Sequence, residues 1–499
     1  MRSVLVGVLA VGLLLRLSLV LVVFHGQGFA ADMRLFVRWG DGLLQSGPSA
    51  FFESQPTANY PPVAIWTLGG LALAAKAIAG VTDASVQSVL AVLVKVPSVL
   101  ADVASAALVF RFARHRAGSR AAVVAAALFL ALPAVWYDSA LWGQLDSLLI
   151  LGSLGALALF QEGHSVLAGV VSVLTMSVKP QGLILVLVIL VAGIAAEVRR
   201  PTGVRRRVRG CAAFVGGMLL TFLVVVVPFD YESLAPAGMR AVPLLGDVAG
   251  FVEQSIHTAG LFPVLTANAF NLWALLGDPS LAASIGSGGG WLPDSLSVLG
   301  VSAAAAGSVL LGVVVVVTLI ALALRPDREA ALGAFVVLSF AFFAFPTRSH
   351  ERYLVPVFGV LAVLAAGSLL RWLMVLLVAA VNTVNLHAVL AGQLSSGGGA
   401  QGVTAVILPF AAEARQEWVV VACSVFQTAA AVAALVWFLL PSRRIPAALS
   451  WPRALGHWCE KCGPPPRGRT SCTTSQALLS TMTVEAGLSR SALGAPRFD

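Results

Sequence analysis

The chain has 499 residues, of which 58% are hydrophobic and only 11% are charged, and its net charge at pH 7 is +9. A soluble domain carries roughly 25% charged residues, so this composition excludes an ordinary soluble protein. Apolar runs of about 18 residues or more, the length that crosses a bilayer, recur along most of the chain. Because the runs are continuous and do not alternate, they exclude a β-barrel and predict an all-α polytopic membrane protein.

The basic residues lie mainly in short loops and in the C-terminal tail, where they set membrane orientation and contact anionic lipid headgroups. We therefore expect no nucleic-acid partner. The first apolar run contains Arg16, and no small-residue cleavage site follows it, so we expect a retained helix and not a signal peptide. The strongest basic cluster, 199–209, predicts a cytoplasmic loop. With the basic loops inside, the outer ends are 138–146, 179–181, 229–296, 347–353 and 393–416.

Apolar run length predicts a bundle of about 11–13 transmembrane helices. The candidate spans are 3–24, 61–80, 87–110, 121–137, 144–160, 165–178, 180–196, 211–228, 297–324, 330–346, 354–370, 372–392 and 417–440. One conflict arises upstream, because full crossings by both 61–80 and 87–110 would place the basic residues of 111–120 outside. Either 61–80 does not fully cross, which we favour, or one charge signal is overridden.

The predicted domains are a transmembrane domain, 1–440, and a cytoplasmic, disordered tail, 441–499, whose composition shifts towards Pro, Arg, Ser and Thr. The transmembrane domain has a long first outer loop, 25–60, and a second long outer loop, 229–296. The tail contains Cys459 and Cys462 at CxxC spacing, which is a weak zinc signal, and a flexible tail is the favoured interpretation.

The acidic residues of the first outer loop, 25–60, include Asp32 and Asp41, which are both candidate site residues. A carboxylate at the membrane edge can deprotonate a hydroxyl if a donor substrate is held beside it, so Asp32 is the candidate catalytic base. The alternative is a solvated interfacial acid beside arginine. The loop ends at the motif 59–62, Asn-Tyr-Pro-Pro, which contains Tyr60 and enforces an extended entry into a helix.

Two further motifs are expected at the outer ends of helices. In 142–147, Trp-Gly-Gln-Leu-Asp-Ser, the side chains of Gln144 and Asp146 can hydrogen-bond sugar hydroxyls, or Asp146 can simply cap a helix. In 179–181, Lys-Pro-Gln, the proline breaks a helix, so that Lys179 has a place near a phosphate with Gln181 beside it. The alternative for Lys179 is a lysine that snorkels at a kink.

The densest polar run beside a span is 348–353, in which cationic His350 and Arg352 could stabilise a departing phosphate. It contains no HExxH spacing, so we predict no zinc site there. In the second long loop, Asn268 and Asn271 could bind sugar or form turns. Within the apolar runs, Asp102 is a candidate for structural ion pairing with Arg16.

Together these motifs resemble the GT-C superfamily of lipid-linked-sugar glycosyltransferases, over about residues 10–370. The resemblance is closer to the bacterial and archaeal relatives of the second mannosyltransferase of the GPI-anchor pathway. It implies a polyprenyl- or dolichyl-phosphate sugar donor, usually of mannose, an active site on the non-cytoplasmic face, and an acid in the first outer loop as base. Met33, and not a second acid, follows Asp32, which leaves a divalent metal requirement open.

We therefore expect a multi-pass membrane enzyme, in the plasma membrane if the chain is bacterial, that transfers a sugar with inversion. The acceptor would be a hydroxyl of a glycolipid, a glycan or a protein, and membrane lipids would surround the bundle. Asp32 would be the general base. The donor phosphate and sugar would be bound by Lys179, Gln181, His350, Arg352, Gln144 and Asp146. No cofactor is assigned. The alternative is a transporter or flippase for a lipid-linked saccharide, since such proteins also carry ionisable residues and broken helices.

Overall fold

The computed structural model describes residues 1–25, 28–199, 204–240, 242, 244–276, 292–396 and 410–440. The predicted tail, 441–499, with its cysteines, lies outside the described residues, as does 277–291 of the second long loop. Helices make up most of what is described. A short hairpin of β1 (Ser297–Val298) and β2 (Val301–Ser302) precedes one of them.

Seven helical stretches of the described chain are long and apolar enough to cross a membrane, which confirms the all-α polytopic class. They are Arg2–Val23, Pro62–Ala79, Val86–Ala131, Val208–Phe229, Ala303–Leu324, Leu369–Ala391 and Glu417–Leu439. Three apolar helices are shorter: Asp146–Gln161, Ser165–Met176 and Pro180–Ala196. These stretches are fewer than the spans predicted from run length, in part because 87–110 and 121–137 fall in one stretch and because three apolar helices are shorter than 18 residues.

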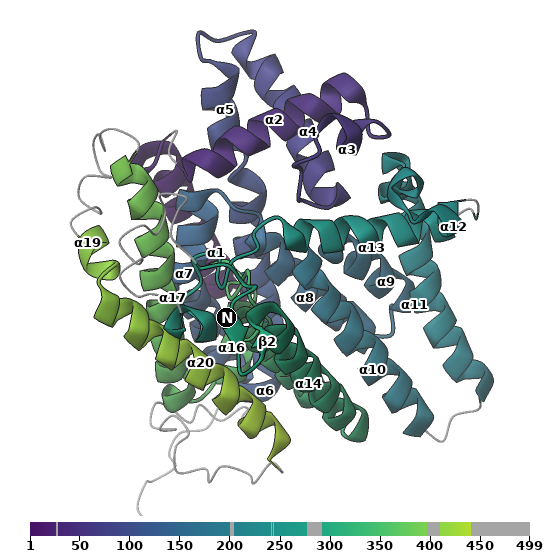
Figure 1. The fold of residues 1–499 in the computed structure, drawn as a ribbon. Coiled ribbons are helices and arrows are strands. Elements are labelled where there is room, and N and C mark those ends of the chain that lie inside the picture. The colour runs from purple at the N-terminus through teal and green to yellow at the C-terminus, as the bar shows by residue number, and fades with distance from the viewer. Residues whose placement is uncertain are drawn as a thin grey trace, which may run out of the picture. The chain divides into compact units, whose positions relative to one another are not determined.

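The elements follow one another along the chain (Figure 1). The first part contains α1 (Arg2–Ser18), η1 (Leu19–Val23), α2 (Ala30–Ser46), α3 (Phe51–Ser54), α4 (Pro62–Ala79), α5 (Val86–Leu93), α6 (Val96–Ala131), α7 (Pro133–Trp136), η2 (Tyr137–Trp142), α8 (Asp146–Gln161), α9 (Ser165–Met176), η3 (Pro180–Gly182) and α10 (Leu183–Arg199). The second part contains α11 (Val204–Val225), η4 (Val227–Phe229), η5 (Tyr231–Leu234), α12 (Ala237–Arg240), α13 (Leu245–Gly260), η6 (Leu272–Leu275), α14 (Ala303–Leu324), α15 (Arg328–Ala344), α16 (Val357–Ala365), α17 (Leu369–Ser396), α19 (Ala411–Ala414) and α20 (Glu417–Leu439).

The segment 25–60, predicted as a loop, is largely helical. In α2 the buried side chains Met33, Phe36, Trp39 and Leu43 recur at the three- and four-residue spacing of one helix face. The polar residues between them, which suggested a loop, occupy the other face. The apolar face of α2 packs on α4. Figure 1 shows α2, α4 and α5 grouped together. Helix α4 has the length and composition of a span, so the expectation that 61–80 does not fully cross stays a prediction.

Two other predicted loops also contain helix. The second long loop, 229–296, includes the 16-residue helix α13. The basic loop expected between 87–110 and 121–137 falls within α6 (Val96–Ala131), which consists of two helices joined at non-helical backbone at Gly118 (φ 80°, ψ 169°), so the helix is interrupted where the loop was predicted. Gly118 makes the kink because only glycine adopts this positive φ freely.

A buried ion pair joins the first helix to α6. Arg16 Nε lies 2.7 Å from Asp102 Oδ2, which also accepts a hydrogen bond from Ser139 Oγ in η2 at 2.7 Å. The side chains of Arg16 and Asp102 are 2% and 0% exposed. This confirms the predicted structural pairing. The pair also connects α1 and α6 to η2, the segment that ends at Trp142.

We expect Asp102→Asn to destabilise the purified protein strongly, because it leaves the Arg16 charge buried without a counter-ion. Breaking such a pair typically costs about 3–5 kcal/mol. The double variant Arg16→Met/Asp102→Leu should recover most of the loss, since neither charge remains. The control variant is Asp41→Asn, which breaks the partly exposed pair Lys76–Asp41, because loss of a surface pair costs about 0–1 kcal/mol. Thermal unfolding in detergent measures all of these variants. Equal losses for the single and the double variant would contradict the ion-pair explanation.

Candidate active site

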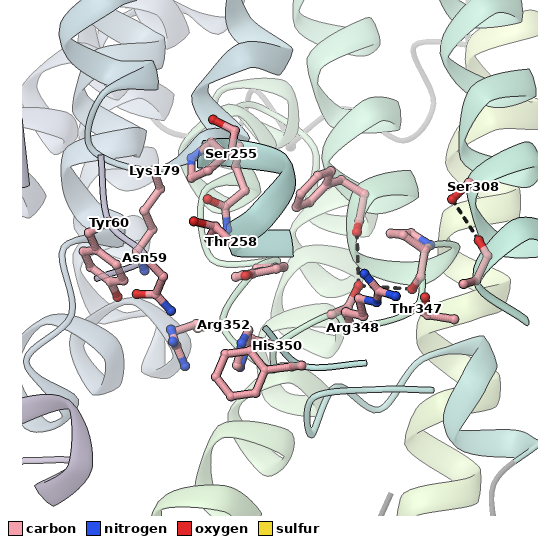
Figure 2. Close-up of a pocket in the computed structure, with 18 of the residues that line it drawn as sticks. Asn59, Tyr60, Lys179, Ser255, Thr258, Ser308, Thr347, Arg348, His350 and Arg352 are labelled. Carbon is pink, nitrogen blue, oxygen red and sulfur yellow. Dashed lines mark hydrogen bonds between the residues drawn. The ribbon is translucent and has the colours of Figure 1, made fainter. Parts of the chain in front are cut away.

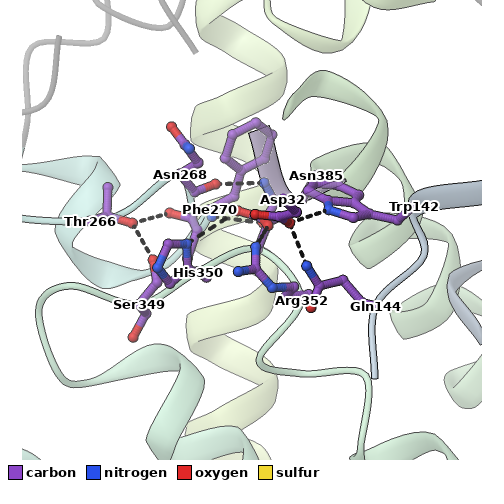
Figure 3. Close-up of polar contacts among 12 residues, drawn as sticks. Asp32, Trp142, Gln144, Thr266, Asn268, Phe270, Ser349, His350, Arg352 and Asn385 are labelled. Atoms are coloured by element: carbon purple, nitrogen blue, oxygen red, sulfur yellow. Dashed lines mark hydrogen bonds and ion pairs between the residues drawn. The ribbon is translucent and has the colours of Figure 1, made fainter. Parts of the chain in front are cut away.

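The site begins at the N-terminus of α2, where Asp32 lies in the first turn. Phe29 N–H donates to the carbonyl of Trp142 at 3.2 Å, and the two rings stack at 4.7 Å, so α2 starts against the 142–146 turn. Asp32 Oδ2 accepts hydrogen bonds from Trp142 Nε1 at 3.0 Å and from Gln144 Nε2 (Figure 3). The carboxylate thus has fixed neighbours on one side, and the helix dipole favours a negative charge at this helix end.

Gly143 allows the turn that presents these two donors. Its φ of 86° is left-handed, and a Cβ at this position would lie 2.9 Å from the Met33 side chain. Both Gly143 N–H and Gln144 N–H donate to the Asp138 carbonyl, and Ser98 Oγ in α6 donates to the Gln144 carbonyl at 2.5 Å. Gly143 therefore leaves room for the Met33 side chain of α2.

Lys179 reaches the same turn from the other side. Helix α9 ends at Met176, and Pro180 opens the short helix η3, which leaves Lys179 in an extended conformation between them. Lys179 Nζ lies 2.6 Å from Asp146 Oδ2 and 3.0 Å from Gln144 Oε1. Tyr60 OH also donates to Gln144 Oε1, at 2.6 Å. One carboxamide therefore connects the aspartate, the lysine and the tyrosine.

The 346–353 segment between α15 and α16 supplies the remaining charged groups. The Ala267 N–H donates to the Ser349 carbonyl, which fixes this segment against 266–270. Arg352 Nη1 lies 2.6 Å from Glu351 Oε1, and the guanidinium carbon is 5.8 Å from the centroid of the Trp142 ring. Figure 3 shows Arg352 beside Asp32, with His350 next to them.

Burial and neighbouring charges determine the protonation states. Burial lowers the pKa of Arg352, but the Glu351 and Asp32 carboxylates raise it, and the result is well above its ordinary value. Burial also lowers the pKa of Lys179, whereas Asp146 and Tyr60 raise it, and the net shift is upward. Both side chains are therefore charged. Burial, with Arg352 and Lys179 nearby, lowers the pKa of His350 well below its ordinary value, so His350 is neutral here, contrary to the expected cation.

A cavity of about 490 Å³ opens beside these residues. Its lining includes Tyr60, Lys179 and Arg352 on one side and Ser308, Thr347 and Arg348 on the other (Figure 2). Ser255 and Thr258 of α13 contribute between them. Within the described chain, three Lys or Arg side chains and no carboxylate line this cavity. Such a lining suits an anion with hydroxyl groups attached.

Several buried polar atoms at the cavity have no hydrogen-bond partner in the described part of the protein. They are Asn59 Oδ1, both amide atoms of Gln181, and Arg352 Nε. Leaving a buried polar group unsatisfied costs about 1–3 kcal/mol, so these groups are suited to a ligand with many hydroxyl or phosphate oxygens. Asn59 and Gln181 belong to the two proline motifs.

An apolar groove of about 630 Å³ adjoins the cavity and shares Pro180 and Ser255 with it. Side chains of α9, α10, α11 and α13 line it, among them Met176, Leu219 and Phe251. The polar cavity therefore lies next to a hydrocarbon-lined surface.

The structure brings together most of the predicted site residues, in two groups. Tyr60, Lys179, Gln181, His350 and Arg352 line the cavity. Asp32, Gln144 and Asp146 do not line it but contact these residues or lie beside them. Gln144 and Asp146 are fully buried and use their polar groups on Asp32, Tyr60 and Lys179, so they support the site and do not face a sugar.

The other three candidates lie elsewhere or have structural partners. Asp41 forms a partly exposed ion pair with Lys76 at 2.8 Å. Asn271 accepts from the Trp273 N–H and donates to the Phe343 carbonyl, so both of its amide atoms are used within the fold. Asn268 lies beside His350 with a φ of 72°, and its carbonyl accepts from Asn385.

Sequence reasoning included Arg348 and Glu351 in the polar run 348–353 but gave them no role, and it missed Asp294 and the hydroxyl residues of α13. A role for Glu351 could have been inferred, because an acid adjoining Arg352 in a buried run needs a partner. Asp294 could not, since it reaches Arg348 from a distant part of the chain. Among the described residues, no group of three His, Cys, Asp or Glu side chains is arranged to hold a metal ion, so the donor set for a divalent metal is not assembled from them.

No family model matches this chain, and no curated protein matches it either. Among solved structures, it is similar to the archaeal oligosaccharyltransferase AglB from Archaeoglobus fulgidus, in complex with an inhibitory peptide and a dolichol-phosphate (14% identity, TM-score 0.41). That match covers 88% of this chain and 56% of AglB, so the chain spans just over half the length of that protein. It is also similar to ArnT from Cupriavidus metallidurans bound to undecaprenyl phosphate, with 15% identity, a TM-score of 0.42, and coverage of 85% and 76%. At TM-scores this low, the proposals below rest on the site itself.

Asp138 in η2 is a buried carboxyl group near the site, and its protonation state can be tested. It is fully buried, neither carboxyl oxygen has a hydrogen-bond partner in the described chain, and burial and Asp146 raise its pKa well above the ordinary value. The native protein therefore keeps a proton that the unfolded chain loses above a pH of about 4, so stability falls as the pH rises. We expect Asp138→Asn to raise the unfolding temperature by a few degrees at pH 7.

This gain should shrink towards zero as the pH approaches about 4, because both side chains are then neutral in both states. Thermal unfolding of wild-type and variant protein across this range is the measurement. A gain that does not depend on pH would mean that Asp138 is not held neutral in the native protein.

Proposed function

We propose that this chain is an integral membrane glycosyltransferase that moves a sugar from a polyprenyl- or dolichyl-phosphate donor to an acceptor hydroxyl. The observation that supports this proposal is that the cationic cavity adjoins an apolar groove and, through Lys179 and Gln144, the carboxylate of Asp32. The mannose donor and the outer face are proposed from the motif resemblance and from the basic loops.

The donor fits the groove and cavity as one molecule. Its lipid chain would lie against α9, α10, α11 and α13, where hydrocarbon surface is available for burial. Its phosphate would lie at Lys179 and Arg352, which are charged and point into the adjoining cavity. The sugar hydroxyls would satisfy the unpaired amide atoms of Asn59 and Gln181. A lipid phosphate is already an activated leaving group, so no nucleotide site is needed.

The proposed reaction inverts the configuration at the anomeric carbon, with the base and the leaving group on opposite sides of the sugar. Gln144 contacts Asp32 with one end of its carboxamide and Lys179 with the other, so the two charged groups are at most roughly 8 Å apart by hydrogen-bond lengths. The acceptor hydroxyl would attack the anomeric carbon from the Asp32 side while the lipid phosphate departs on the Lys179 side.

Net charge in the site would be conserved during this reaction. The acceptor O–H proton moves to Asp32, a bond forms between the acceptor oxygen and the anomeric carbon, and the bond to the phosphate oxygen breaks. The negative charge thus passes from Asp32 to the phosphate. Arg352 interacts with Asp32 and lines the cavity, so it can stabilise the charge at both positions without a large movement.

Asp32→Asn should lower the rate of sugar transfer by about 10²–10⁴-fold, the usual contribution of a general base. Binding of the donor lipid should persist, because Lys179, Arg352 and the groove are unchanged. The assay uses the purified protein in proteoliposomes with radiolabelled polyprenyl-phosphate mannose and a membrane extract as acceptor source. Donor binding is measured separately, by thermal stabilisation with the same lipid.

Asp41→Asn is the matched control, because it makes the same change in the same helix but in a partly exposed pair remote from the cavity lining. It should retain transfer activity. Full activity of Asp32→Asn would remove Asp32 from the mechanism. Counterflow of labelled lipid-linked saccharide by the wild-type protein, without any covalent product, would instead favour the transporter or flippase.

A further inference from the structure

Each of the three cationic side chains in the described lining of the cavity is paired with a carboxylate that does not line it. Lys179 pairs with Asp146, Arg348 with Asp294, and Arg352 with Glu351. A buried charge requires such a counter-ion. The third pair differs from the others, because its cation also interacts with the carboxylate of Asp32.

Glu351 is held rigidly at this position. Its side chain is 1% exposed, and its backbone carbonyl accepts a hydrogen bond from Asn382 Nδ2 of α17 at 3.0 Å. Glu351 Oε1 receives Arg352 Nη1, whereas Oε2 has no hydrogen-bond partner among the described residues and lies 3.9 Å from His350 Nδ1. Glu351 and Arg352 are neighbours in the chain, so the pairing is set by the local turn and anchored by one residue of a distant helix.

Two carboxylates, those of Glu351 and Asp32, therefore act most strongly on one guanidinium, and Figure 3 shows Arg352 beside Asp32. If Glu351 were absent, Asp32 would be the strongest acidic neighbour of Arg352, since Asp146 contributes less and pairs with Lys179, and Coulomb attraction would draw Arg352 and Asp32 together. A guanidinium paired fully with Asp32 would compete with the acceptor proton for the carboxylate oxygens. It would also turn away from the phosphate region of the cavity.

We propose that Glu351 is a positioning residue, which holds Arg352 towards the donor phosphate and prevents it from forming a closed ion pair with the base Asp32. This inference rests on the proposed function, since it assigns a role within the same transfer reaction. Glu351 touches neither the sugar nor the acceptor in this scheme, and it acts only through Arg352.

Glu351→Gln should lower kcat by about 10–100-fold, a loss typical of a catalytic group displaced by about 1 Å. The KM for the donor should change much less, because Lys179 and the groove still bind it. Glu351→Asp retains the charge and should recover part of the rate. Thermal unfolding of each purified variant in detergent checks that the variants are folded.

A double-mutant cycle tests whether Glu351 acts through Arg352. The double variant Glu351→Gln/Arg352→Gln should be no slower than Arg352→Gln alone, because there is then no guanidinium to position. Losses that multiply in the double variant would overturn the proposal. An equally large kcat loss in Asp294→Asn, which removes the carboxylate behind Arg348, would also overturn it, since any missing counter-ion would then impair the cavity.

These experiments distinguish failure of the proposed function from failure of the role of Glu351. If the wild-type protein transfers no sugar from any polyprenyl-phosphate donor, the proposed function fails and the role of Glu351 fails with it. If the wild-type protein is active and the two losses multiply, only the role of Glu351 fails.

Discussion

The carboxamide of Gln144 is the connection on which the site depends. A carboxylate only accepts hydrogen bonds and an ammonium only donates them, so a single neutral group can join Asp32 to Lys179 only if it has both a donor and an acceptor. The Gln144 side chain is fully buried. Its orientation is fixed by its neighbours, with Nε2 towards Asp32 and Oε1 towards Lys179 and Tyr60.

The backbone turn 142–146, which holds Gln144, is stabilised by the helices around it. Gly143 lets α2 approach, Ser98 of α6 holds the Gln144 carbonyl, and the Asp138 carbonyl receives two N–H groups of the turn. Ser139, the residue after Asp138, donates to the Asp102 carboxylate that pairs with Arg16. The structural ion pair and the candidate active site are therefore consecutive parts of one buried polar network.

Charge pairing explains why some predicted sugar-binding residues have another role. Cations that face a cavity in an apolar bundle need counter-ions, and these must lie outside the cavity if the cavity is to bind an anion. Asp146 meets this need for Lys179, and Asp294 and Glu351 meet it for the two arginines. The polar residues of a motif thus divide between those that face a ligand and those that stabilise them.

The sequence alone determined the membrane class, because continuous apolar runs of spanning length have few other outcomes in water. It also identified the residues around which the candidate site forms. Asp32, Lys179 and Arg352 are charged groups at the ends of apolar runs, and a charge near the membrane interior is costly unless it has a function. It did not reveal α2 or α13, because their polar faces conceal a helical period when the sequence is read only for apolar length.

Only the tertiary structure decided which of these residues face the cavity and which support it. Asp32, Gln144, Lys179 and Glu351 come from four separate segments, and their contacts depend on how those segments pack, which local pattern does not encode. The protonation of His350 was also decided there. Its neutrality comes from burial beside two cations that lie far from each other along the chain and close together in the fold.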